Sequence, residues 1–428
     1  MLVRHTDVAV APGLLRIPFE KLFRAWLKER QIMTRHSRCL AVVIALGFST
    51  SGETSEFFGL LHDGIVPAGT PEVFVGGHRP DGRVLGGISA DGHVLSGTYT
   101  LPIAEQPPCP PNADCPLATE AFRWSPESRF EPIRPAGFPP GRFREGGPIA
   151  ADGLSLLVYG RLPPPDTIVS SRSFLWSVEQ GLTDFGTVVE EEMTHVAIAT
   201  DLSADGSVVV GSFDDEAIRW TSEKGIELLG DLPGGAFRSV ANGVSHNGSV
   251  IAGTGTSVSD AGSQAFRWTE ETGLVGLGYV DSLAQTTATG ISPSGEVVIG
   301  YADGSSEPEV AFRWTQEDGI QDIGPGIPTA IAEDGTIVGH SYGEGTTFVW
   351  SEAHGRRGLE DVLANDFGLG ESIEGWTLES IWDISADGTT LVGAGMNPAA
   401  EWDVWVARRL PGDYNSDALR GFSRTTGS

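Results

Sequence analysis

The sequence predicts an all-β protein, and specifically a seven-bladed β-propeller with four-stranded antiparallel blades. Three observations lead to this expectation. The chain has 57 Gly among 428 residues, with 8% aromatic and 20% charged residues, which is typical of turn-rich β proteins. A hairpin motif recurs seven times, and a tryptophan motif follows each copy. Because repeated units can share one architecture, we expect one large domain despite the length.

The hairpin motif places Asp-Gly, Asn-Gly or a similar pair between a short apolar stretch and a Val/Ile/Leu run. These pairs suit the two positive-φ positions of a type I′ turn, so we predict type I′ hairpins. Successive turn glycines are 61, 53, 42, 47, 40 and 53 residues apart, which argues against the constant coil length of a β-helix. The seven copies are Ser89–Gly92, Ala150–Gly153, Ser203–Gly206, Ser245–Gly248, Ser292–Gly295, Ala332–Gly335 and Ser385–Gly388.

The tryptophan motif reads as a third strand, because Phe312 and Trp314 then share one face while Ala311 and Arg313 share the other. A polar turn and a fourth short strand follow in most copies, as at 316–324. Four short antiparallel strands in about 40–50 residues are typical of a propeller blade. The copies are Ala121–Trp124, Ser173–Trp176, Ala217–Trp220, Ala265–Trp268, Ala311–Trp314, Thr347–Trp350 and Asp403–Trp405. Another blade number or a split β-sandwich array is the alternative.

The last copy has no fourth strand after Trp402–Val406. The segment Glu56–Leu61, just before the first hairpin, resembles the fourth strands of other copies, such as Glu227–Leu232. We therefore expect this N-terminal strand to complete the last blade and close the ring, which removes the exposed sheet edges.

The N-terminal region predicts export. Basic residues at 35–38 precede the apolar run Leu40–Phe48 and the small residues 49–52, which is the pattern of a signal peptide and is too short for a membrane span of ~20 residues. We expect translation to start at Met33, with residues 1–32 as an upstream extension; a genuine amphipathic arm at 14–28 is the alternative. The predicted organisation is therefore 1–52 extension and signal peptide, 53–410 propeller, and 411–428 tail.

The charge limits the partners. The formal net charge is −29, and residues 1–52 alone carry +5, so residues 53–428 carry −34. Such a surface repels a phosphate backbone, which excludes nucleic acid as an expected partner and leaves cations, basic proteins and neutral glycans.

The repeat resembles the bacterial extracellular HAF repeats. The resemblance rests on Gly-Ile-Ser-x-x-Gly-x-Val-Val-x-Gly at 290–300, on Ala-Phe-Arg-Trp-Thr at 311–315 and on the following Gly-x-x-x-Leu-Gly pattern, and it covers about residues 57–406. It implies export and a repetitive β architecture, and it brings no catalytic residues.

The tail is similar to the opening of a dockerin-type calcium loop. Asp413, Asn415 and Asp417 match loop positions one, three and five, whose oxygen atoms ligate Ca²⁺. Ala418 and Arg424 stand where the loop needs Gly and a bidentate acid, and no second loop follows. We therefore expect a degenerate tail, with Ca²⁺ as a possible ligand and no required cofactor.

The two cysteines that remain after signal-peptide removal, Cys109 and Cys115, lie in a proline-rich segment. An even pair in an exported chain predicts a disulfide, and a two-cysteine metal site is the alternative.

No hydrolase, zinc, phosphate or dinucleotide fingerprint is present in the sequence. Serines before the hairpin turns recur in five units, so we interpret them as turn residues. The acidic runs Glu190–Glu192 and Asp214–Glu216 predict solvated loops, with calcium ligation or glycosidase chemistry as alternatives. His195 has no second histidine at ligand spacing. We expect the arginines of the tryptophan strands to make salt bridges between blades or to stack on aromatics.

These observations predict a secreted, non-enzymatic and monomeric propeller that binds an extracellular glycan or protein through variable loops. The candidate contact segments are 98–120, 186–196, 256–263 and 301–309. A carbohydrate-active enzyme, either glycosidase or lyase, is the first alternative, and a spacer without a ligand is the second. Carboxylates and aromatics converging on the central channel would favour the enzyme.

Overall fold

The structure is a computed structural model, and all residues that it describes belong to the compact unit Gly52–Ser428. The described residues are 56–59, 86–101, 105, 118–134, 143–160, 172–185, 187–190, 193–257, 262–281, 283, 285–304, 307–341 and 346–409. None of their helices is long and apolar enough to cross a membrane.

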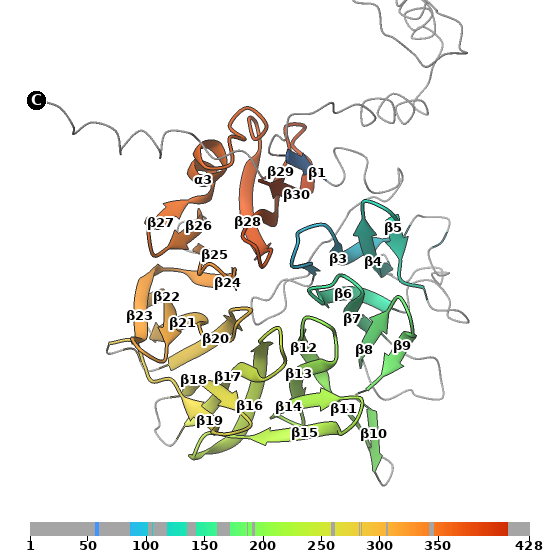
Figure 1. The fold of residues 1–428 in the computed structure, drawn as a ribbon, viewed down its shortest axis with the longest axis vertical. Coiled ribbons are helices and arrows are strands. Elements are labelled where there is room, and N and C mark those ends of the chain that lie inside the picture. Colours follow the sequence, from blue (N-terminus) through green and yellow to red (C-terminus); the bar gives the residue numbers. More distant parts are fainter. Residues whose placement is uncertain are drawn as a thin grey trace, which may run out of the picture. The chain divides into compact units, whose positions relative to one another are not determined.

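Seven four-stranded antiparallel sheets form the blades of a propeller, as predicted, and they follow one another round a ring (Figure 1). Blade 1 contains β2 (Gly87–Ile88), β3 (Leu95–Thr100), β4 (Thr119–Ser125) and β5 (Arg129–Pro132). Blade 2 contains β6 (Phe143–Ile149), β7 (Ser155–Gly160), β8 (Arg172–Ser177) and β9 (Gly181–Asp184). Blade 3 contains β12 (Ile198–Leu202), β13 (Val208–Phe213), β14 (Glu216–Thr221) and β15 (Gly225–Gly230). Blade 4 contains β16 (Gly234–Val244), β17 (Val250–Ser257), β18 (Ser263–Thr269) and β19 (Gly273–Gly276).

The remaining blades follow the same order from the innermost to the outermost strand. Blade 5 contains β20 (Gln285–Ile291), β21 (Val298–Gly304), β22 (Glu307–Thr315) and β23 (Gly319–Pro325). Blade 6 contains β24 (Ile327–Ile331), β25 (Ile337–Ser341), β26 (Thr346–Ser351) and β27 (Gly355–Gly358). Blade 7 contains β28 (Thr377–Ile384), β29 (Thr390–Met396), β30 (Trp402–Arg408) and β1 (Glu56–Gly59).

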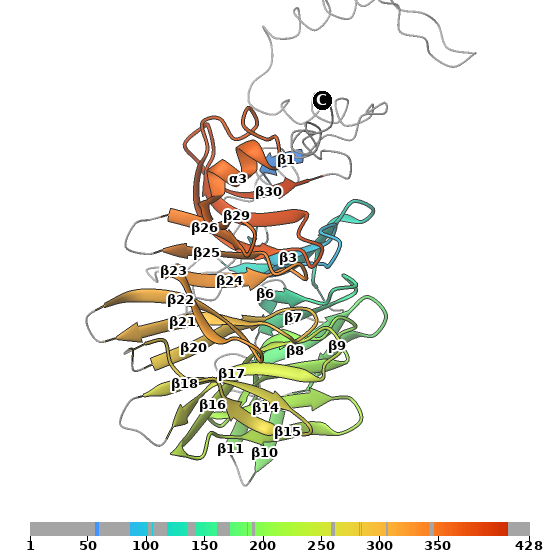
Figure 2. The ribbon, with the colours of Figure 1, turned by 60° about the vertical axis from the view of Figure 1, so that its left-hand side comes forward.

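The N-terminal strand closes the ring, as the sequence predicted. β1 pairs antiparallel with β30 from Glu56 opposite Arg408 to Gly59 opposite Trp405, and the two strands lie side by side in both ribbon views (Figures 1 and 2). The last blade therefore combines the two ends of the chain, which spares β30 an open edge.

Alternate residues of each third strand face different neighbouring blades. In β22, Phe312 and Trp314 pack toward blade 4, in one hydrophobic cluster with Ala252 and Ala265. Ala311 belongs to another cluster, with Phe348 of blade 6. Phe312 and Trp314 thus share a face as predicted, and the opposite face is buried as well because each blade is packed between two others.

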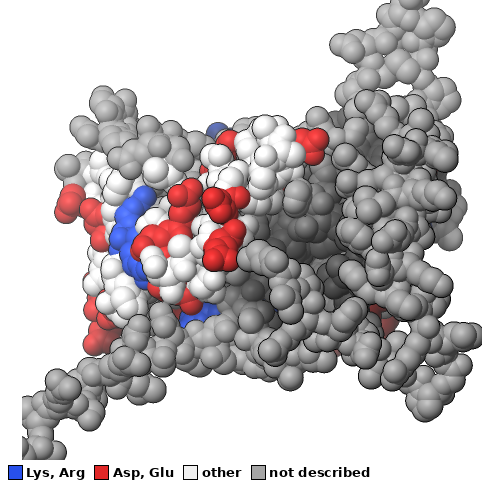
Figure 3. Space-filling view, turned by 90° about the horizontal axis from the view of Figure 1, so that it is seen from above, with Lys and Arg blue, Asp and Glu red and all other residues white. Residues whose placement is uncertain are grey.

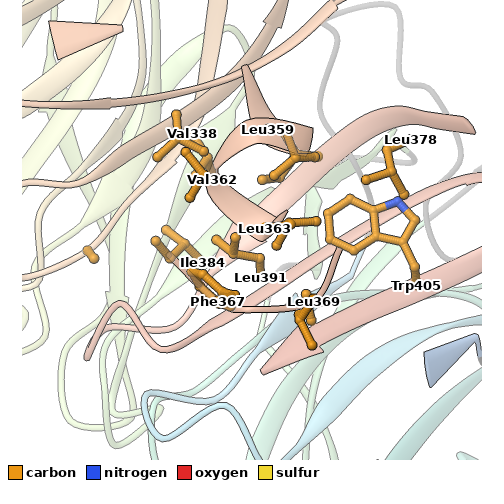
Figure 4. Close-up of a cluster of buried hydrophobic side chains, with 14 residues drawn as sticks. Val338, Leu359, Val362, Leu363, Phe367, Leu369, Leu378, Ile384, Leu391 and Trp405 are labelled. Carbon is orange, nitrogen blue, oxygen red and sulfur yellow. The ribbon is translucent and has the colours of Figure 1, made fainter. Parts of the chain in front are cut away.

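Seven hydrophobic clusters fill the seven interfaces between blades. The cluster between blades 6 and 7 is the most extended, because the connection between these blades adds the helix α3 (Leu359–Asn365) to it (Figure 4). Leu363 of α3 lies beside the ring of Trp405 in blade 7, whereas Val362 lies beside Val338 of blade 6, so the helix fills the space between the two blades (Figure 4).

The hairpins between the first and second strands are not type I′ turns, which corrects the prediction. Only their glycines have positive φ, as in Gly92 at 71° and Gly248 at 69°, while the preceding Asp or Asn does not. The glycine N–H instead donates to the first residue of the turn, as from Gly92 to the Ser89 carbonyl at 2.9 Å. A type I′ turn does occur at Asp214 and Asp215, with φ of 48° and 67° between β13 and β14.

Three further features differ from the repeat pattern. Among the residues that the structure describes, the helix α3 and the hairpin β10 (Thr187–Glu190) with β11 (Met193–Val196) have no counterparts in other blades. Trp405 lies opposite Gly393, which is the position of Phe312 opposite Gly300 in blade 5. The tryptophan of the last copy is therefore equivalent to the phenylalanine of the others, and Ala407 takes the tryptophan position.

Candidate functional site

The innermost strands enclose a cavity of about 230 Å³ on the axis of the ring. Each blade contributes the apolar residue that precedes its hairpin turn. These residues are Ile88, Ile149, Leu202, Val244, Ile291, Ile331 and Ile384. The cavity is smaller than the ~300–1,000 Å³ pockets that bind drug-sized ligands, so it suits a small group.

Bulges in the innermost strands tie neighbouring blades together around this cavity. The bulge residue of blades 3 to 6 is Thr or Asn, and its side chain donates to a carbonyl of the next blade. The bonds run from Thr200 to Ala241 at 2.6 Å, from Asn242 to Ala288 at 2.8 Å, from Thr289 to Pro328 at 2.7 Å and from Thr329 to Ile381 at 3.2 Å. Trp382 takes this position in blade 7 and lines the cavity instead.

Two carboxylates lie next to these bulges, at a position where the other five blades have Gly, Pro or Ala. Asp383 accepts the N–H of Ile384 at 2.8 Å and of Ile88 in blade 1 at 3.0 Å. Asp201 likewise accepts the N–H of Leu202 at 2.9 Å and of Val244 in blade 4 at 2.9 Å. Each side chain thus joins its own blade to the next, and both line the cavity.

The environment of Asp383 disfavours its charge. Burial raises the pKa of Asp383 to about 7, the two backbone hydrogen bonds work against this rise, and the negative charge of Asp201 adds to it. The residue keeps part of its surface open to the cavity, although protein surrounds it on the other sides. The carboxyl group therefore keeps its proton to a higher pH than an ordinary aspartic acid does.

The hairpin turns form the mouth of the cavity through hydrogen bonds from turn to turn. The second turn residue usually donates to the second residue of the next turn, as from Ala204 to the His246 carbonyl at 3.0 Å and from His246 to Pro293 at 2.9 Å. Pro293 has no N–H, and Ser294 donates to Glu333 Oε2 at 3.0 Å instead. Burial lowers the pKa of His246, while the charge of Glu333 raises it.

The two ends of the ring differ sharply. We call the end with the hairpin turns the turn face; its turns are short in every blade, and those between third and fourth strands all span three residues, as at 126–128 and 352–354. We call the opposite end the connector face, because it carries the second-to-third-strand loops and the connections between blades. Those segments include the single residue Gly326 between β23 and β24 and the stretch 359–376 with its helix. Variation in length is thus concentrated on one face.

Trp402 is a large aromatic residue exposed on the connector face, with 44% of its surface accessible. It begins β30, directly after the loop 397–401. Asn397 fixes this loop, since its buried side-chain Oδ1 accepts the N–H of Ala399 at 2.9 Å and of Glu401 at 3.0 Å. Ala400 has φ of 59°, a strained value for a residue other than glycine. The loop therefore presents Trp402 from a rigid base.

A second anchor on this face joins two connections of blade 1. Arg134 donates to the buried carboxylate of Glu120 at 2.7 Å and to Glu105 at 2.8 Å. Tyr99 also donates to Glu120 at 2.7 Å, and burial raises the pKa of this phenol. The network holds Glu105, in the long second-to-third-strand loop, against the start of the connection to blade 2.

The surface that includes α3 is acidic. Acidic side chains gather on the described part of this surface, and basic side chains form only narrow patches on it (Figure 3). Glu360, Glu371 and Glu374 are exposed there, whereas Asp361 and Asp366 pair with Arg357. An acidic polymer would be repelled by this surface.

The serines before the hairpin turns are turn residues, as predicted. Ser89 Oγ donates to Asp91 at 2.6 Å and accepts the Val94 N–H at 2.9 Å. Ser245 makes the same contacts with Asn247 and Val250. Because these hydroxyls make the same hydrogen bonds in repeated copies, their role is to hold the turn.

The arginines of the third strands do connect blades, but mainly through turn carbonyls. Arg123 donates to Gly153 of blade 2 at 2.8 Å, and Arg267 donates to Gly295 of blade 5 at 3.4 Å. Arg313 lies over the Trp350 ring of blade 6, 5.6 Å from its centre, as the stacking prediction had it. The described ion pairs of Arg123, Arg219 and Arg313 lie within their own blades. Of the two predicted roles, the interblade salt bridge is therefore wrong for Arg123 and Arg219, whereas Arg313 takes the other role, stacking.

The acidic runs do not form a described metal site. Asp214 and Asp215 make the tight turn, and Glu216 accepts the Gly230 N–H at 3.0 Å. Glu190 and His195 lie in the strands of the β10–β11 hairpin. Among the described residues, no three His, Cys, Asp or Glu side chains are grouped so that they could hold a metal ion.

Several predicted features fall outside the described residues. They are Cys109 and Cys115, the tail residues Asp413, Asn415 and Asp417, the signal peptide, and large parts of the candidate contact segments.

Comparison with known proteins finds similar solved structures but no family. No family model and no curated protein matches the chain. Among solved structures, the chain is similar to the propeller domain of the Trilobed protease from Pyrococcus furiosus, with 11% identity, a TM-score of 0.45, and coverage of 77% of this chain and 99% of that one. It is also similar to Porphyromonas gingivalis dipeptidyl peptidase 4, with 10% identity and a TM-score of 0.42. That match covers 75% of this chain and only 50% of the peptidase.

The cavity carboxylates and Trp402 were missed as candidates from the sequence. The signal for Asp201 and Asp383 was nonetheless present, because an acid replaces Gly, Pro or Ala at one position of the aligned repeat. Trp402 had no such signal, since its exposure depends on how the loop 397–401 folds.

Proposed function

We propose that this protein is an exported, non-enzymatic binding propeller that holds a neutral extracellular glycan on its connector face. The observation that carries the proposal is the exposed Trp402, held by a rigid loop on the face where the chain varies in length. A tryptophan ring offers a flat apolar platform with a polar N–H, which suits the faces and hydroxyls of a sugar ring. Glu401, exposed beside it, supplies a hydrogen-bond acceptor.

The acidic surface favours a neutral glycan over a charged one. Carboxylates such as those of Glu371 and Glu374 repel uronate or sulfate groups, and they can accept hydrogen bonds from hydroxyls. A basic protein is the other class of partner that this charge admits.

A glycan-active enzyme is the second candidate, because Asp201 and Asp383 converge on one cavity with Trp382. Two features weigh against it. Both oxygens of each carboxylate already accept backbone N–H groups, which ties the side chains to the fold. The cavity of about 230 Å³ is also narrow for a sugar chain with two catalytic groups around it.

The test combines binding and turnover. The purified exported chain is labelled and applied to an array of neutral, acidic and basic glycans, with Ca²⁺ and with a chelator. The glycans that bind are then incubated with the protein in solution, and products are sought by mass spectrometry. We expect retention of neutral glycans and unchanged oligosaccharides. New reducing ends or unsaturated products would show that the protein is a glycan-active enzyme instead. If no glycan on the array binds and a basic protein from a separate panel does, the ligand is a protein.

A further inference from the structure

We propose that the turn face binds a basic protein partner at Leu154 and Val178 of blade 2. The partner places an apolar side chain against this pair and sets Lys or Arg side chains against the carboxylates around it. This surface lies at the opposite end of the ring from the connector-face site of the proposed function and does not depend on it.

Two exposed apolar side chains lie together on this face. Leu154 is 44% exposed and Val178 is 52% exposed, and the Val178 N–H donates to the Leu154 carbonyl at 3.0 Å. This bond continues the pairing of Ser155 with Ser177 between β7 and β8, so the two side chains are cross-strand neighbours. No other two of the exposed large apolar side chains in the described part of the chain are paired across strands.

The pair departs from the repeat in both of its members. The positions equivalent in register to Leu154 and Val178 carry mostly polar side chains in other blades. These pairs are His93 with Pro126, Ser207 with Ser222, Ser249 with Glu270, Glu296 with Gln316, and Thr389 with Arg409. The ring therefore folds without an aliphatic pair at this place, and about half of each side chain stays open to solvent.

The pair also continues an apolar surface that begins inside the ring. Leu154 and Val178 lie two residues from Leu156 and Trp176, hence on the same side of their strands. Leu156 and the partly buried Trp176 belong to the hydrophobic cluster between blades 1 and 2, which the partly buried Val94 of blade 1 also contacts. The exposed pair is thus the outer end of this interface rather than two scattered surface residues.

Carboxylates surround the pair. Asp152 lies beside it, since its Oδ1 accepts the N–H of Leu154 at 2.8 Å, and Glu179 follows Val178 in the chain. The equivalent turns of blades 1 and 3 carry Glu127 and Glu223. All four acids are exposed, and none of them forms an ion pair among the described residues.

This charge selects a basic protein over other occupants. A second copy of the chain, with its net charge of −29, and an anionic membrane would both be repelled. A neutral glycan would find aliphatic side chains here, which offer neither an aromatic face nor a hydrogen-bonding group. An apolar anchor with a charged rim is the usual arrangement of a protein interface, and the uniformly short turns leave room for a folded partner.

The experiment selects ligands of this chemistry directly. A phage library of short random peptides is selected on the full exported chain, with the double variant Leu154→Ser/Val178→Ser present in solution as a competitor. We expect enriched sequences in which an aliphatic or aromatic residue is flanked by Lys or Arg. Enrichment of acidic or uncharged sequences, or no enrichment over the competitor, overturns the proposal.

Variants then locate the site. Leu154→Ser and Val178→Ser introduce the residues that blade 3 has at the equivalent positions, Ser207 and Ser222, so the fold tolerates them elsewhere in the ring. We expect the double variant to bind an enriched peptide at least tenfold more weakly, measured by fluorescence polarisation. Glu179→Gln should weaken binding severalfold at low salt and less at high salt, because salt screens exposed charges.

Two controls separate this site from the rest of the surface. Leu228→Ser removes an equally exposed apolar side chain from the outer strand β15, and Trp402→Ala alters the connector face. Both should bind the peptide as the parent does. Circular dichroism and thermal melts confirm that each variant is folded. Undiminished binding by the folded double variant, or an equal loss in Leu228→Ser or Trp402→Ala, overturns the proposal.

Discussion

Gly300 in β21 lies directly opposite Phe312 in β22, and the two residues fit only because Gly300 has no side chain. A Cβ atom at Gly300 would lie 2.6 Å from the Phe312 ring and even closer to the Thr287 carbonyl oxygen of β20. The same pairing recurs at Gly253 with Phe266. The glycine that ends the repeat's Val-Val-x-Gly run is therefore the space into which the third-strand aromatic packs.

Gly300→Ala should consequently destabilise the protein by about 1–3 kcal/mol, because the backbone of β20 must move to relieve the contact. The measurement is the urea midpoint followed by tryptophan fluorescence. Gly370→Ala is the control, since a Cβ there would lie in ordinary contact, 3.6 Å from Ala364, and the φ is ordinary. Equal midpoints for the two variants would contradict this account of the repeat.

Removing the cation from the blade 1 network should be more costly. Arg134→Met leaves the Glu120 carboxylate, 1% exposed, without its ion-pair partner, and we expect a loss of about 3 kcal/mol. Glu120→Gln in the Arg134→Met background removes the stranded charge and should recover part of the loss. Thermal melts of the single and double variants measure this coupling, and strictly additive effects would refute it.

Ring closure by β1 predicts that deletion of residues 53–62 lowers the melting temperature. β1 supplies the fourth strand of blade 7, and its loss exposes the edge of β30. An unchanged melting temperature in the deletion variant would show that the ring does not need this strand.

Asp383 gives the stability a defined pH dependence. Its folded pKa of about 7 lies above the ordinary aspartate value of 3.8, so between these two pH values the folded state binds a proton that the unfolded state has lost. The contribution of Asp383 to stability is therefore full below pH ~4 and is lost as the pH rises through 7, by at most about 4 kcal/mol. Asp383→Ala should be relatively more stable at pH 8 than at pH 5, compared with the parent. Parallel stability curves for the two proteins over this range would contradict the assignment.

Much of the fold was predictable because the repeated sequence motifs indicate it. Seven copies of the same turn and aromatic strand predicted seven blades, and the missing strand of the last copy predicted closure by the N-terminus. The turn type was wrong because Asp-Gly also occurs where only the glycine has positive φ, as at Gly92. The insertions α3 and β10–β11 have no second copy, so no repeat signalled them. Trp405 was aligned with the tryptophans of the other copies, but it stands at the position where those copies have a phenylalanine.

The sites were less predictable for a related reason. Repetition identifies residues that build the scaffold, such as Ser89 and Arg123, and these proved to make turn and interblade contacts. Functional candidates are the departures from repetition. Asp383 is recognised as such a departure only when equivalent positions of the blades are compared. The exposure of Trp402 becomes apparent only when the loop that carries it is folded.

The measurement that tests the binding function most directly compares two exposed apolar residues on opposite faces. Trp402 and Leu154 are each 44% exposed, the first on the connector face and the second in a hairpin turn. Surface plasmon resonance is run with the neutral glycan that the parent protein retains most strongly. The proposed function predicts that Trp402→Ala weakens binding at least tenfold and that Leu154→Ala leaves it unchanged. Undiminished binding by Trp402→Ala, or an equal loss in Leu154→Ala, would contradict a glycan site on the connector face.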